Sequence, residues 1–256
     1  MAIHIGLDLG SISVKAALYS TDPADAAFFE RNSPNPLFQE IKCWKSQECG
    51  GESGEKMLAL TRYQRIAGNP LKQARILLEE LIRLVGPGSL GQVAGTGSGA
   101  ALLESEFGLP PQNEFRALAR ASELLIPKVR TLFEMGGENS KYISLERDEQ
   151  SGRVGIADYQ TNGDCAAGTG GFLDQQALRL RFSVDQIGGI VSATGRAPKI
   201  AGRCSVFAKS DMIHAQQKGF TPEEILKGLC EAVARNFKSA ISRGKKIEPE
   251  VAFIGG

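Results

Sequence analysis

The sequence predicts an α/β protein with two lobes that each begin with a β-hairpin. Residues 3–20 read as an apolar strand, a Gly/Ser turn and a returning strand, and residues 130–148 repeat this order. The two copies align at one constant offset, since Asp8, Gly10 and Lys15 match Glu134, Gly136 and Lys141, each 126 residues further on. Because the repeats of solenoid proteins are far shorter, we interpret the pattern as a duplicated domain.

A chain of 256 residues is long enough for two lobes of ordinary size. We assign the lobes to residues 1–127 and 128–256. The final segment, "EVAFIGG", is an apolar strand that runs into two glycines. A natural domain seldom stops on a strand without docking a further element, so we expect the chain to be cut from a longer one at residue 256.

The elements of the first lobe follow from periodicity and breakers. Residues 69–88 carry leucines at helical spacing, and Gly86-Pro87-Gly88 ends this predicted helix. A short strand is expected over residues 91–100. Residues 20–54 have no clear period and contain three prolines, so we expect a long surface excursion there, without a functional interpretation.

Two helices are predicted in the second lobe. Thr221 as N-cap, Pro222 at the first helical position and Glu224 three residues after the cap predict a helix that continues to Ile241. The run that follows Cys204 is also helical in spacing and stops at Gly219. Its inward face is predicted to consist of Val206, Phe207, Ser210 and Ile213.

Composition excludes several classes of function. The formal net charge of +1 gives no electrostatic reason to expect nucleic acid. No apolar run approaches the ~18 residues of a membrane span, and the first residues lack a signal peptide's basic segment. Five cysteines in a chain of this size indicate reduced thiols rather than a disulfide framework. We therefore expect a cytoplasmic protein with no membrane or nucleic-acid partner.

Each hairpin is a candidate phosphate site. A Gly/Ser turn exposes backbone N–H groups and hydroxyls to anionic oxygens, and Ser11, Ser13 and Lys15 suit that task. Asp8 can hold Mg²⁺ through its water shell, and Glu134 is expected to face it from the second lobe. The alternative is that "DLGS" is only a hairpin turn, and the in-register second copy favours the phosphate interpretation.

Two lobes that present matched hairpins to one cleft resemble the actin, sugar-kinase and heat-shock-protein ATPase superfamily. This resemblance implies an actin-like (ribonuclease H-like) ATPase fold that binds ATP and Mg²⁺. By the same match Gly10, Gly136, Gly137 and Lys141 contact the nucleotide. The terminal "FIGG" resembles the adenosine-binding glycine pair of that superfamily, at Gly255 and Gly256, although an ordinary Gly-Gly turn is an equal alternative.

Two cysteines precede predicted helices. Cys165 and Cys204 both lie where free N–H groups and the positive end of a helix dipole favour a thiolate. A nucleophilic cysteine needs a base, and His4 and His214, the two histidines, lie in a strand and in mid-helix. Metal binding fits better, yet two thiolates complete neither a zinc site nor an iron–sulfur cluster. A homodimer would supply four thiolates at one two-fold axis and enclose a [4Fe–4S] cluster.

The other three cysteines are given ordinary roles. Cys230 lies on the apolar face of the last helix and is expected to be a small buried hydrophobe. Cys43 and Cys49 lie six residues apart in the irregular stretch and are expected to be free thiols, with a metal clip as the alternative.

Four segments together resemble one family. "DCAAGTGGF" and "GRCSVFAKSDMI", with cysteines 39 residues apart, follow "DLGSISVK" and "EMGGENSK". They are similar to the activator ATPases of 2-hydroxyacyl-CoA dehydratases and to the ATPase subunits of benzoyl-CoA reductase. The resemblance spans the chain apart from residues 20–54. It implies a homodimeric ATPase with one bridging [4Fe–4S] cluster, held by Cys165 and Cys204, that takes electrons from a reductant and drives them into a dehydratase-type partner enzyme.

Several positions depart from that family's pattern. Where the family has D-I-G-G-Q-D, this chain has Glu134, Glu138 and Asn139. Gly171 replaces a usual Arg, and Lys209 replaces a usual Glu. These departures concern the rate of hydrolysis and the pairing with a dehydratase more than the fold.

Two rival functions remain at this point. A small-molecule kinase of the same superfamily would phosphorylate an acceptor and hold no iron. A degenerate ATPase domain within a larger fused protein would bind nucleotide without turnover, and the altered "EMGGEN" segment suggests it.

Overall fold

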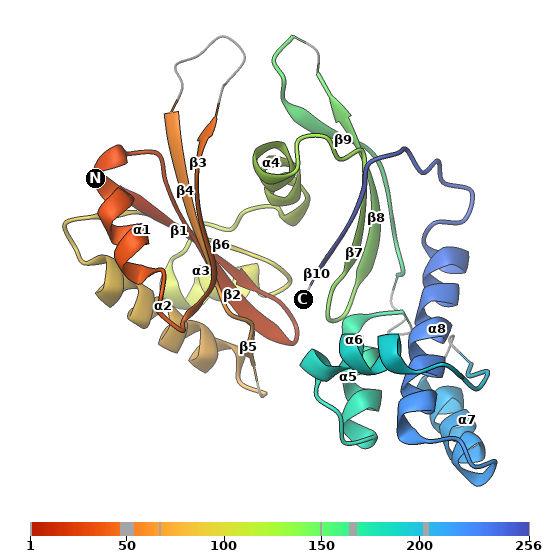
Figure 1. Ribbon diagram of the computed structural model, residues 1–256. Coiled ribbons are helices and arrows are strands. Elements are labelled where there is room, and N and C mark those ends of the chain that lie inside the picture. Colours follow the sequence, from red (N-terminus) through yellow and green to blue (C-terminus); the bar gives the residue numbers. More distant parts are fainter. Residues whose placement is uncertain are drawn as a thin grey trace. The chain divides into compact units, whose positions relative to one another are not determined.

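A computed structural model describes residues 2–46, 54–66, 68–148, 150–163, 168–201 and 205–255. The chain divides into two compact units (Figure 1). The first comprises Met1–Leu125 with Arg147–Arg153, and the second Ile126–Glu146 with Val154–Gly256. Among the described helices, none is long and apolar enough to cross a membrane.

The first unit is built on a six-stranded sheet. Its order is β3-β4-β2-β1-β6, with β5 paired to β2. The strands are β1 (Ile3–Leu9), β2 (Ser13–Ser20), β3 (Phe38–Ser46), β4 (Gly54–Thr61), β5 (Gln64–Arg65) and β6 (Leu90–Thr96). Alternate residues of β1 (Ile3, Ile5, Leu7 and Leu9) are buried, as expected for a strand that packs one face on a core.

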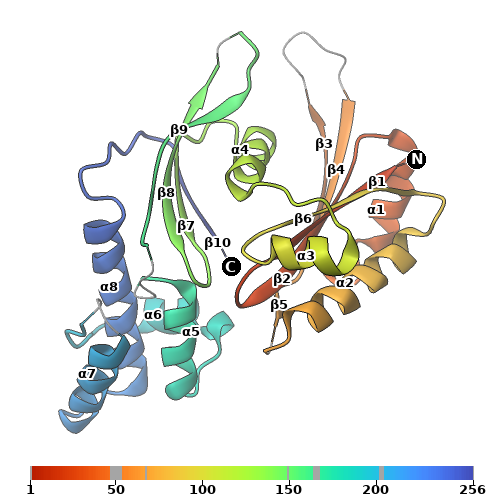
Figure 2. The same cartoon turned by 180° about the vertical axis from the view of Figure 1, so that it is seen from behind.

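The first unit also contains helices. They are the 3₁₀ helix η1 (Pro23–Asp25), α1 (Ala26–Asn32), α2 (Pro70–Val85), α3 (Ala100–Phe107) and α4 (Glu114–Leu125). Helix α1 packs on β3 and β4, α2 on β1 and β2, and α3 on β1 and β6 (Figure 2). The predicted helix over residues 69–88 is confirmed: Asn69 caps it by accepting a hydrogen bond from the Lys72 N–H, and Gly86 ends it with φ of 79°.

The expectation of an irregular excursion over residues 20–54 is wrong. The described part of this stretch forms η1, α1 and β3, and Phe28, Phe29 and Phe38 enter the core. Strand β3 lies at the edge of the sheet, so polar residues occupy much of it and hide the period-two pattern. The aromatic residues of this stretch indicate that it packs on the core, whereas its prolines suggested a surface loop.

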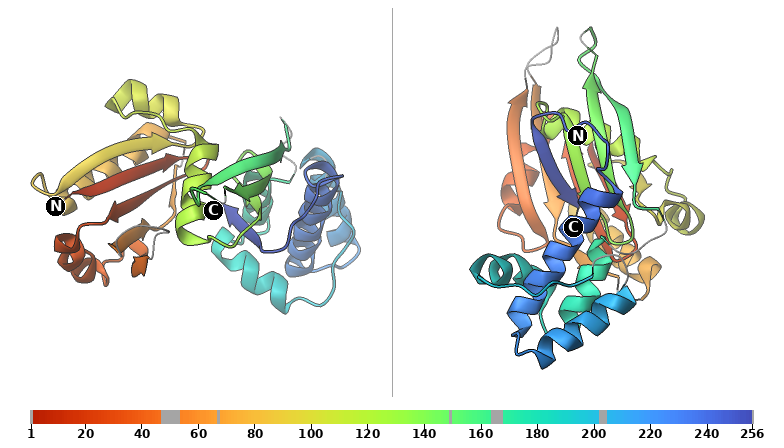
Figure 3. Two further views of the ribbon diagram at one scale, coloured as in Figure 1. Left: turned by 90° about the horizontal axis from the view of Figure 1, so that it is seen from above. Right: turned by 90° about the vertical axis from the view of Figure 1, so that its right-hand side faces the viewer.

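The second unit has a four-stranded sheet of order β10-β7-β8-β9. The strands are β7 (Thr131–Met135), β8 (Ser140–Arg147), β9 (Val154–Thr161) and β10 (Val251–Gly255). The helices are α5 (Gly170–Arg179), α6 (Val184–Ala193), α7 (Ser205–Gln217) and α8 (Pro222–Ala240). Phe237 and Ile241 at the end of α8 pack on Phe133 and Tyr142 of the sheet, while α5, α6 and α7 pack around α8 (Figures 1 and 3).

The α8 start is as predicted, and the α7 face is not. Thr221 and Glu224 form the reciprocal capping box of α8. On α7, however, Phe207 is 66% exposed and Ile213 is 47% exposed, and Ala208, Met212 and Ala215 face the core instead. Both sets have helical spacing, and the one with two alanines lets α7 approach α8 closely.

The duplication predicted from the sequence is confirmed in the strand registers. Asp8 pairs with Lys15 across the first hairpin and Glu134 with Lys141 across the second. A third strand then runs parallel to the first in each unit, β6 beside β1 and β10 beside β7. The repeated structure is therefore a hairpin with a parallel strand added at its side.

Candidate functional site

The turn between β1 and β2 carries the first group of predicted site residues. Gly10 donates its N–H to the Ser13 carbonyl (2.9 Å), which closes the turn. Asp8 and Lys15 are half-buried and face each other in register, Ser13 is buried and Ser11 is exposed. The structure thus brings these five residues into one strand, turn and strand, with an acid and a base beside an exposed hydroxyl.

Sequence reasoning missed Gly97, which lies against Asp8. With φ of +89°, it has a conformation that favours glycine, and a Cβ atom here would lie 2.4 Å from Asp8 Oδ1 and 2.6 Å from the Leu9 carbonyl oxygen. The glycine run "AGTGSG" at the end of β6 was the available signal. The backbone therefore approaches the Asp8 carboxylate as closely as only glycine allows.

The second hairpin brings Glu134 and Lys141 together. Lys141 Nζ lies 2.6 Å from Glu134 Oε2, and the two residues are 6% and 9% exposed. Gly136 donates its N–H to the Asn139 carbonyl (2.9 Å), as Gly10 does to Ser13 in the first copy. The second acid of the duplicated motif is therefore bound by the lysine of the same motif, in an ion pair that is buried.

Gly255 occupies the position in β10 that matches the end of β6. Its φ is +129°, and a Cβ atom would lie 2.2 Å from the Met135 carbonyl oxygen. Met135 is the counterpart of Leu9, whose carbonyl oxygen Gly97 approaches in the first unit. The glycine requirement is thus duplicated with the hairpin. Gly256 lies outside the described residues.

Cys165 also lies outside the described residues, but both flanks of its segment, residues 164–167, are described. Ser140 N donates to Asn162 Oδ1 (2.9 Å) on one side, and Ser140 Oγ donates to the Gly168 carbonyl (2.8 Å) on the other. A Cβ atom at Gly168, where φ is +94°, would lie 3.0 Å from Asn236 Nδ2 of α8. The segment therefore leaves and rejoins the fold at fixed points.

The predicted role of helix N–H groups at Cys165 concerns a residue outside the described ranges, but the start of the helix that follows it is described. Helix α5 begins at Gly170, and Gly170 and Gly171 donate their N–H groups to the carbonyls of Gly136 and Gly137, each at 2.8 Å. The Phe172 N–H binds the side chain of the N-cap, Thr169. These donors of the first turn are already engaged, so they are not free to stabilise a thiolate.

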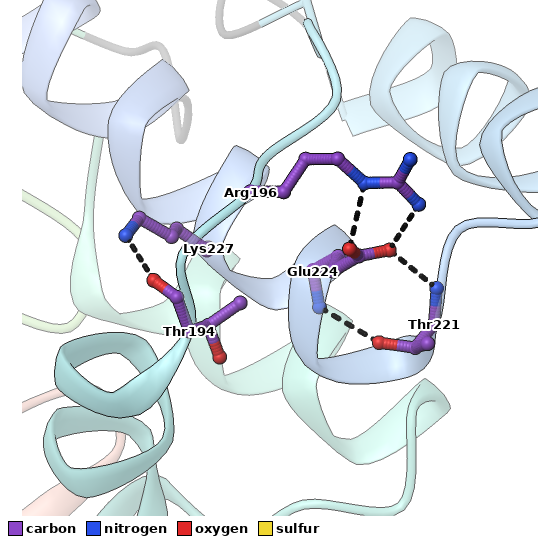
Figure 4. Close-up of polar contacts among 5 residues, drawn as sticks. All are labelled: Thr194, Arg196, Thr221, Glu224 and Lys227. Atoms are coloured by element: carbon purple, nitrogen blue, oxygen red, sulfur yellow. Dashed lines mark hydrogen bonds and ion pairs between the residues drawn. The ribbon is translucent and has the colours of Figure 1, made fainter.

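Cys204 lies in residues 202–204, which are outside the described part, and α7 begins at the next residue. The segment that leads to it, residues 194–201, crosses α8 (Figure 4). Arg196 donates to both carboxylate oxygens of Glu224 (2.7 and 3.0 Å), and Lys227 donates to the Thr194 carbonyl. The hydrogen bond from Arg196 lowers the pKa of the Glu224 carboxyl.

The described flanks of the two cysteine segments lie beside adjacent residues of α8. Arg235 donates to the Ile200 carbonyl (3.1 Å), two residues before the undescribed segment of Cys204. Asn236, the next residue, lies so near Gly168, at the end of the segment of Cys165, that a Cβ atom there would come within 3.0 Å of its Nδ2. One helix therefore lies next to the described flanks of both predicted metal ligands.

The described thiols do not form a metal centre. Within the described ranges, no group of three or more His, Cys, Asp or Glu residues is placed to hold a metal ion. Burial raises the pKa of the Cys230 thiol to about 11, and burial together with Glu55 and Glu30 raises that of Cys43. Both thiols favour the protonated form, in keeping with the ordinary roles predicted for them. Cys49 lies outside the described residues.

A duplicated hairpin with a parallel third strand, and a glycine packed against each hairpin, agree with the actin-like fold predicted from the sequence. The chain belongs to the BadF/BadG/BcrA/BcrD ATPase family, which matches residues 5–256. It is therefore an ATPase of that family, as the sequence motifs predict.

Two similar sequences and one solved structure illustrate this membership. The chain is 34% identical over 257 residues to the uncharacterized protein YjiL of Escherichia coli, covering 100% of this chain and 83% of that protein. It is 31% identical over 144 residues to the 2-hydroxyisocaproyl-CoA dehydratase activator of Clostridioides difficile, covering 56% of this chain and 52% of the activator. The solved structure of the Clostridium difficile activator of that dehydratase, with bound ADPNP, matches with a TM-score of 0.73 and 23% identity, over 99% of this chain and 80% of that one.

These comparisons differ in what they establish. The alignment with the activator spans about half of the activator's length. At 23% identity the structural match shows the fold alone. The dehydratase in the name of the activator is therefore a property of the activator and is not transferred to this chain.

Proposed function

We propose that this chain is an ATP-driven donor of low-potential electrons to a dehydratase-type partner. Two copies would share one [4Fe–4S] cluster, held by Cys165 and Cys204 of each. The observation that carries the proposal is that the described flanks of both cysteine segments lie next to the neighbouring residues Arg235 and Asn236 of α8. Membership of an ATPase family and the named activators among its relatives support the same function.

The donor set fits an iron–sulfur cluster. Cysteine thiolates are the soft ligands that such clusters take, and two per chain require a second chain to complete four. When bound, the cluster supplies a one-electron couple. The chain's part would be to hold the flanks of the two cysteine segments next to α8, and the reduced thiols that the cluster needs would fit a cytoplasmic setting.

We propose that ATP binds with its phosphates on the two hairpin turns. Ser11, Ser13 and Lys15 contact phosphate from the first, and Gly136 and Gly137 from the second. Asp8 positions Mg²⁺ through water, and Glu134 orients the attacking water. Gly255 and Gly256 are proposed to contact the adenosine.

The phosphate assignment is tested at Lys15. Lys15→Ala removes one charge-assisted hydrogen bond, so the Kd for ATP with Mg²⁺ should rise about 10- to 150-fold. Lys72→Ala removes an exposed lysine at the start of α2 and serves as the matched control, with no change in Kd expected. Unchanged affinity in Lys15→Ala would remove the hairpin from the nucleotide site.

The cluster assignment is tested by analysis of anaerobically purified protein. We expect about four iron and about four labile sulfide per dimer, or about two of each per chain. Cys165→Ser and Cys204→Ser should each abolish the iron, and Cys230→Ser should retain it. A protein that takes up no iron on anaerobic reconstitution with iron and sulfide would refute the electron-donor function.

One observation favours the degenerate ATPase as second candidate. Glu134 is paired with Lys141 in a buried ion pair, so the second acid is already engaged. A chain in which this pair persists with nucleotide bound would bind ATP and not hydrolyse it. Phosphate release at saturating ATP and Mg²⁺ separates the two functions, since only the electron donor requires turnover.

A further inference from the structure

One buried serine joins the second hairpin to the segment that contains Cys165. Ser140, the first residue of β8, is fully buried. Its Oγ donates to the Gly168 carbonyl (2.8 Å) and its N–H donates to Asn162 Oδ1 (2.9 Å). The Asn162 N–H donates back to the Ser140 carbonyl (3.2 Å). A single residue thus binds both ends of the stretch between residues 162 and 168.

The turn of the same hairpin is bound to the same stretch. Gly170 and Gly171, at the start of α5, donate to the carbonyls of Gly136 and Gly137. We call these two hydrogen bonds, with the three at Ser140, the Ser140 junction. All five join the hairpin of the second unit to residues 162–171. A shift of the turn therefore has to break these bonds or carry both ends of the stretch with it.

Comparison of the two hairpins shows that the junction belongs to one copy. At the constant offset of 126 residues, Ser140 matches Val14, and both residues are fully buried. Val14 pairs with Leu9 as Ser140 pairs with Met135, and Val14 belongs to the apolar core of its unit. A hairpin strand can thus bury an apolar residue at this position. The second copy instead buries a hydroxyl and uses it to bind the Gly168 carbonyl.

Neighbouring residues connect the junction to the proposed nucleotide site. Lys141 follows Ser140 directly and pairs with Glu134. Gly136 and Gly137 form the turn that is proposed to contact phosphate. The hydrogen bonds of Ser140 to Asn162 and Gly168 are short and partly or fully buried, so they hold their geometry against competition from water.

We propose that Ser140 is a positioning residue that couples nucleotide on the second hairpin to the segment of Cys165. This inference rests on the proposed function for its two end points. Nucleotide at Gly136 and Gly137 would hold the turn in place, and the junction would transmit that restraint to the described flanks, residues 162–163 and 168–171. The effect on the segment is a coupling between two sites, and coupling of this kind commonly amounts to about 5- to 150-fold.

Hydrogen exchange with and without ADPNP and Mg²⁺ tests the proposal on the whole chain. In the parent, saturating nucleotide should slow exchange in peptides that cover residues 161–173 at least about fivefold. Ser140→Ala should bind ADPNP with a Kd within about twofold of the parent and yet lose most of this slowing. Asn162→Ala removes the acceptor of the Ser140 N–H from the other side, and it should lose the slowing as well.

Thr131→Val is the matched control. Thr131 is a fully buried hydroxyl of the same sheet, and it binds the backbone of Glu248 instead of the stretch at Cys165. A merely structural role of Ser140 predicts that Thr131→Val and Ser140→Ala lower stability alike and leave the nucleotide effect on residues 161–173 unchanged. Coupling predicts that only Ser140→Ala and Asn162→Ala abolish the effect.

The outcomes separate this inference from the proposed function. Full nucleotide-linked slowing in both Ser140→Ala and Asn162→Ala, or none in the parent, overturns the coupling. A parent that shows the slowing but takes up no iron overturns the electron-donor function and leaves the coupling intact. In iron-loaded protein, ADPNP should also change the rate at which a chelator removes iron, and this change should shrink in Ser140→Ala and persist in Thr131→Val.

Discussion

At the second hairpin, two side chains that the sequence assigns to ligand binding bind one another. Glu134 and Lys141 face each other in register on β7 and β8, and both are nearly buried. Removing one partner of a buried pair leaves an uncompensated charge, which costs about 3–5 kcal/mol, whereas an exposed pair contributes about 0–1 kcal/mol. The repeat in the sequence identifies both residues as candidate site residues, because they match Asp8 and Lys15. It did not show their pairing, because the first copy suggests that each faces a ligand.

The first prediction measures this pair. Lys141→Met should lower the free energy of unfolding by about 3 kcal/mol, because Glu134 loses its buried partner. Arg120→Met, which breaks the exposed pair with Glu123 on α4, should change it by less than about 1 kcal/mol. Urea unfolding of both variants provides the measurement. Equal effects of the two substitutions would show that the Glu134–Lys141 pair does not contribute as a buried one.

The second prediction concerns Cys230. Burial raises the pKa of its thiol to about 11, so the group is protonated at neutral pH and reacts slowly with iodoacetamide. Alkylation should accelerate about tenfold per pH unit as pH rises toward 11, because the thiolate is the reactive form. Mass spectrometry of the modified peptide follows the rate. At pH 8 the exposed Cys43 should react before Cys230, and faster modification of Cys230 would contradict its placement.

At the scale of elements, capping residues predict the helices well, whereas the alternation of apolar residues predicts the edge strand β3 poorly. Asn69 and Thr221 start α2 and α8 as their side chains suggest. Strand β3 was missed because an edge strand needs few apolar residues. The inward face of α7 was assigned to Phe207 and Ile213 because large apolar residues usually point inward, whereas the packing on α8 selects Ala208 and Ala215. Local chemistry determines where a helix begins, and its neighbours determine which face is buried.

The third prediction belongs to the crossing of α8 by residues 194–201. A Cβ atom at Gly228 would lie 2.5 Å from the Pro198 carbonyl oxygen. Alanine gains up to about 1 kcal/mol in helix propensity over glycine, but the clash costs about 1–3 kcal/mol. We therefore expect Gly228→Ala to destabilise the protein.

A matched control exists on the neighbouring helix. Gly188 of α6 has no atom within 4 Å of an added Cβ, so Gly188→Ala should stabilise by up to about 1 kcal/mol. The midpoints of thermal unfolding of the two variants should shift in opposite directions. A rise in both midpoints would mean that residues 194–201 do not press on α8 at Gly228.

For the whole molecule, the repeat predicts the architecture, because a duplication leaves a pattern across the whole sequence. No single helix or strand leaves such a pattern. The offset of 126 residues locates both hairpins, and the structure adds a parallel third strand and a glycine against each. Gly97 and Ser140 escaped sequence reasoning because each acts on a residue distant in the chain. Contacts such as Ser140 with Gly168 arise from the folded arrangement of β8 and the start of α5.

The last prediction links the cluster to the assembly. In the proposed assembly, two thiolates per chain cannot fill the four ligand positions of a cubane, so iron retention should be linked to dimerisation. On anaerobic dilution, bound iron and dimer mass should decrease together, and the midpoint should follow protein concentration. Cys165→Ser and Cys204→Ser should each lose both properties, while Cys230→Ser should follow the parent. A monomer that retains its iron after dilution would require four ligands from one chain. That result would rule out a cluster shared between two chains.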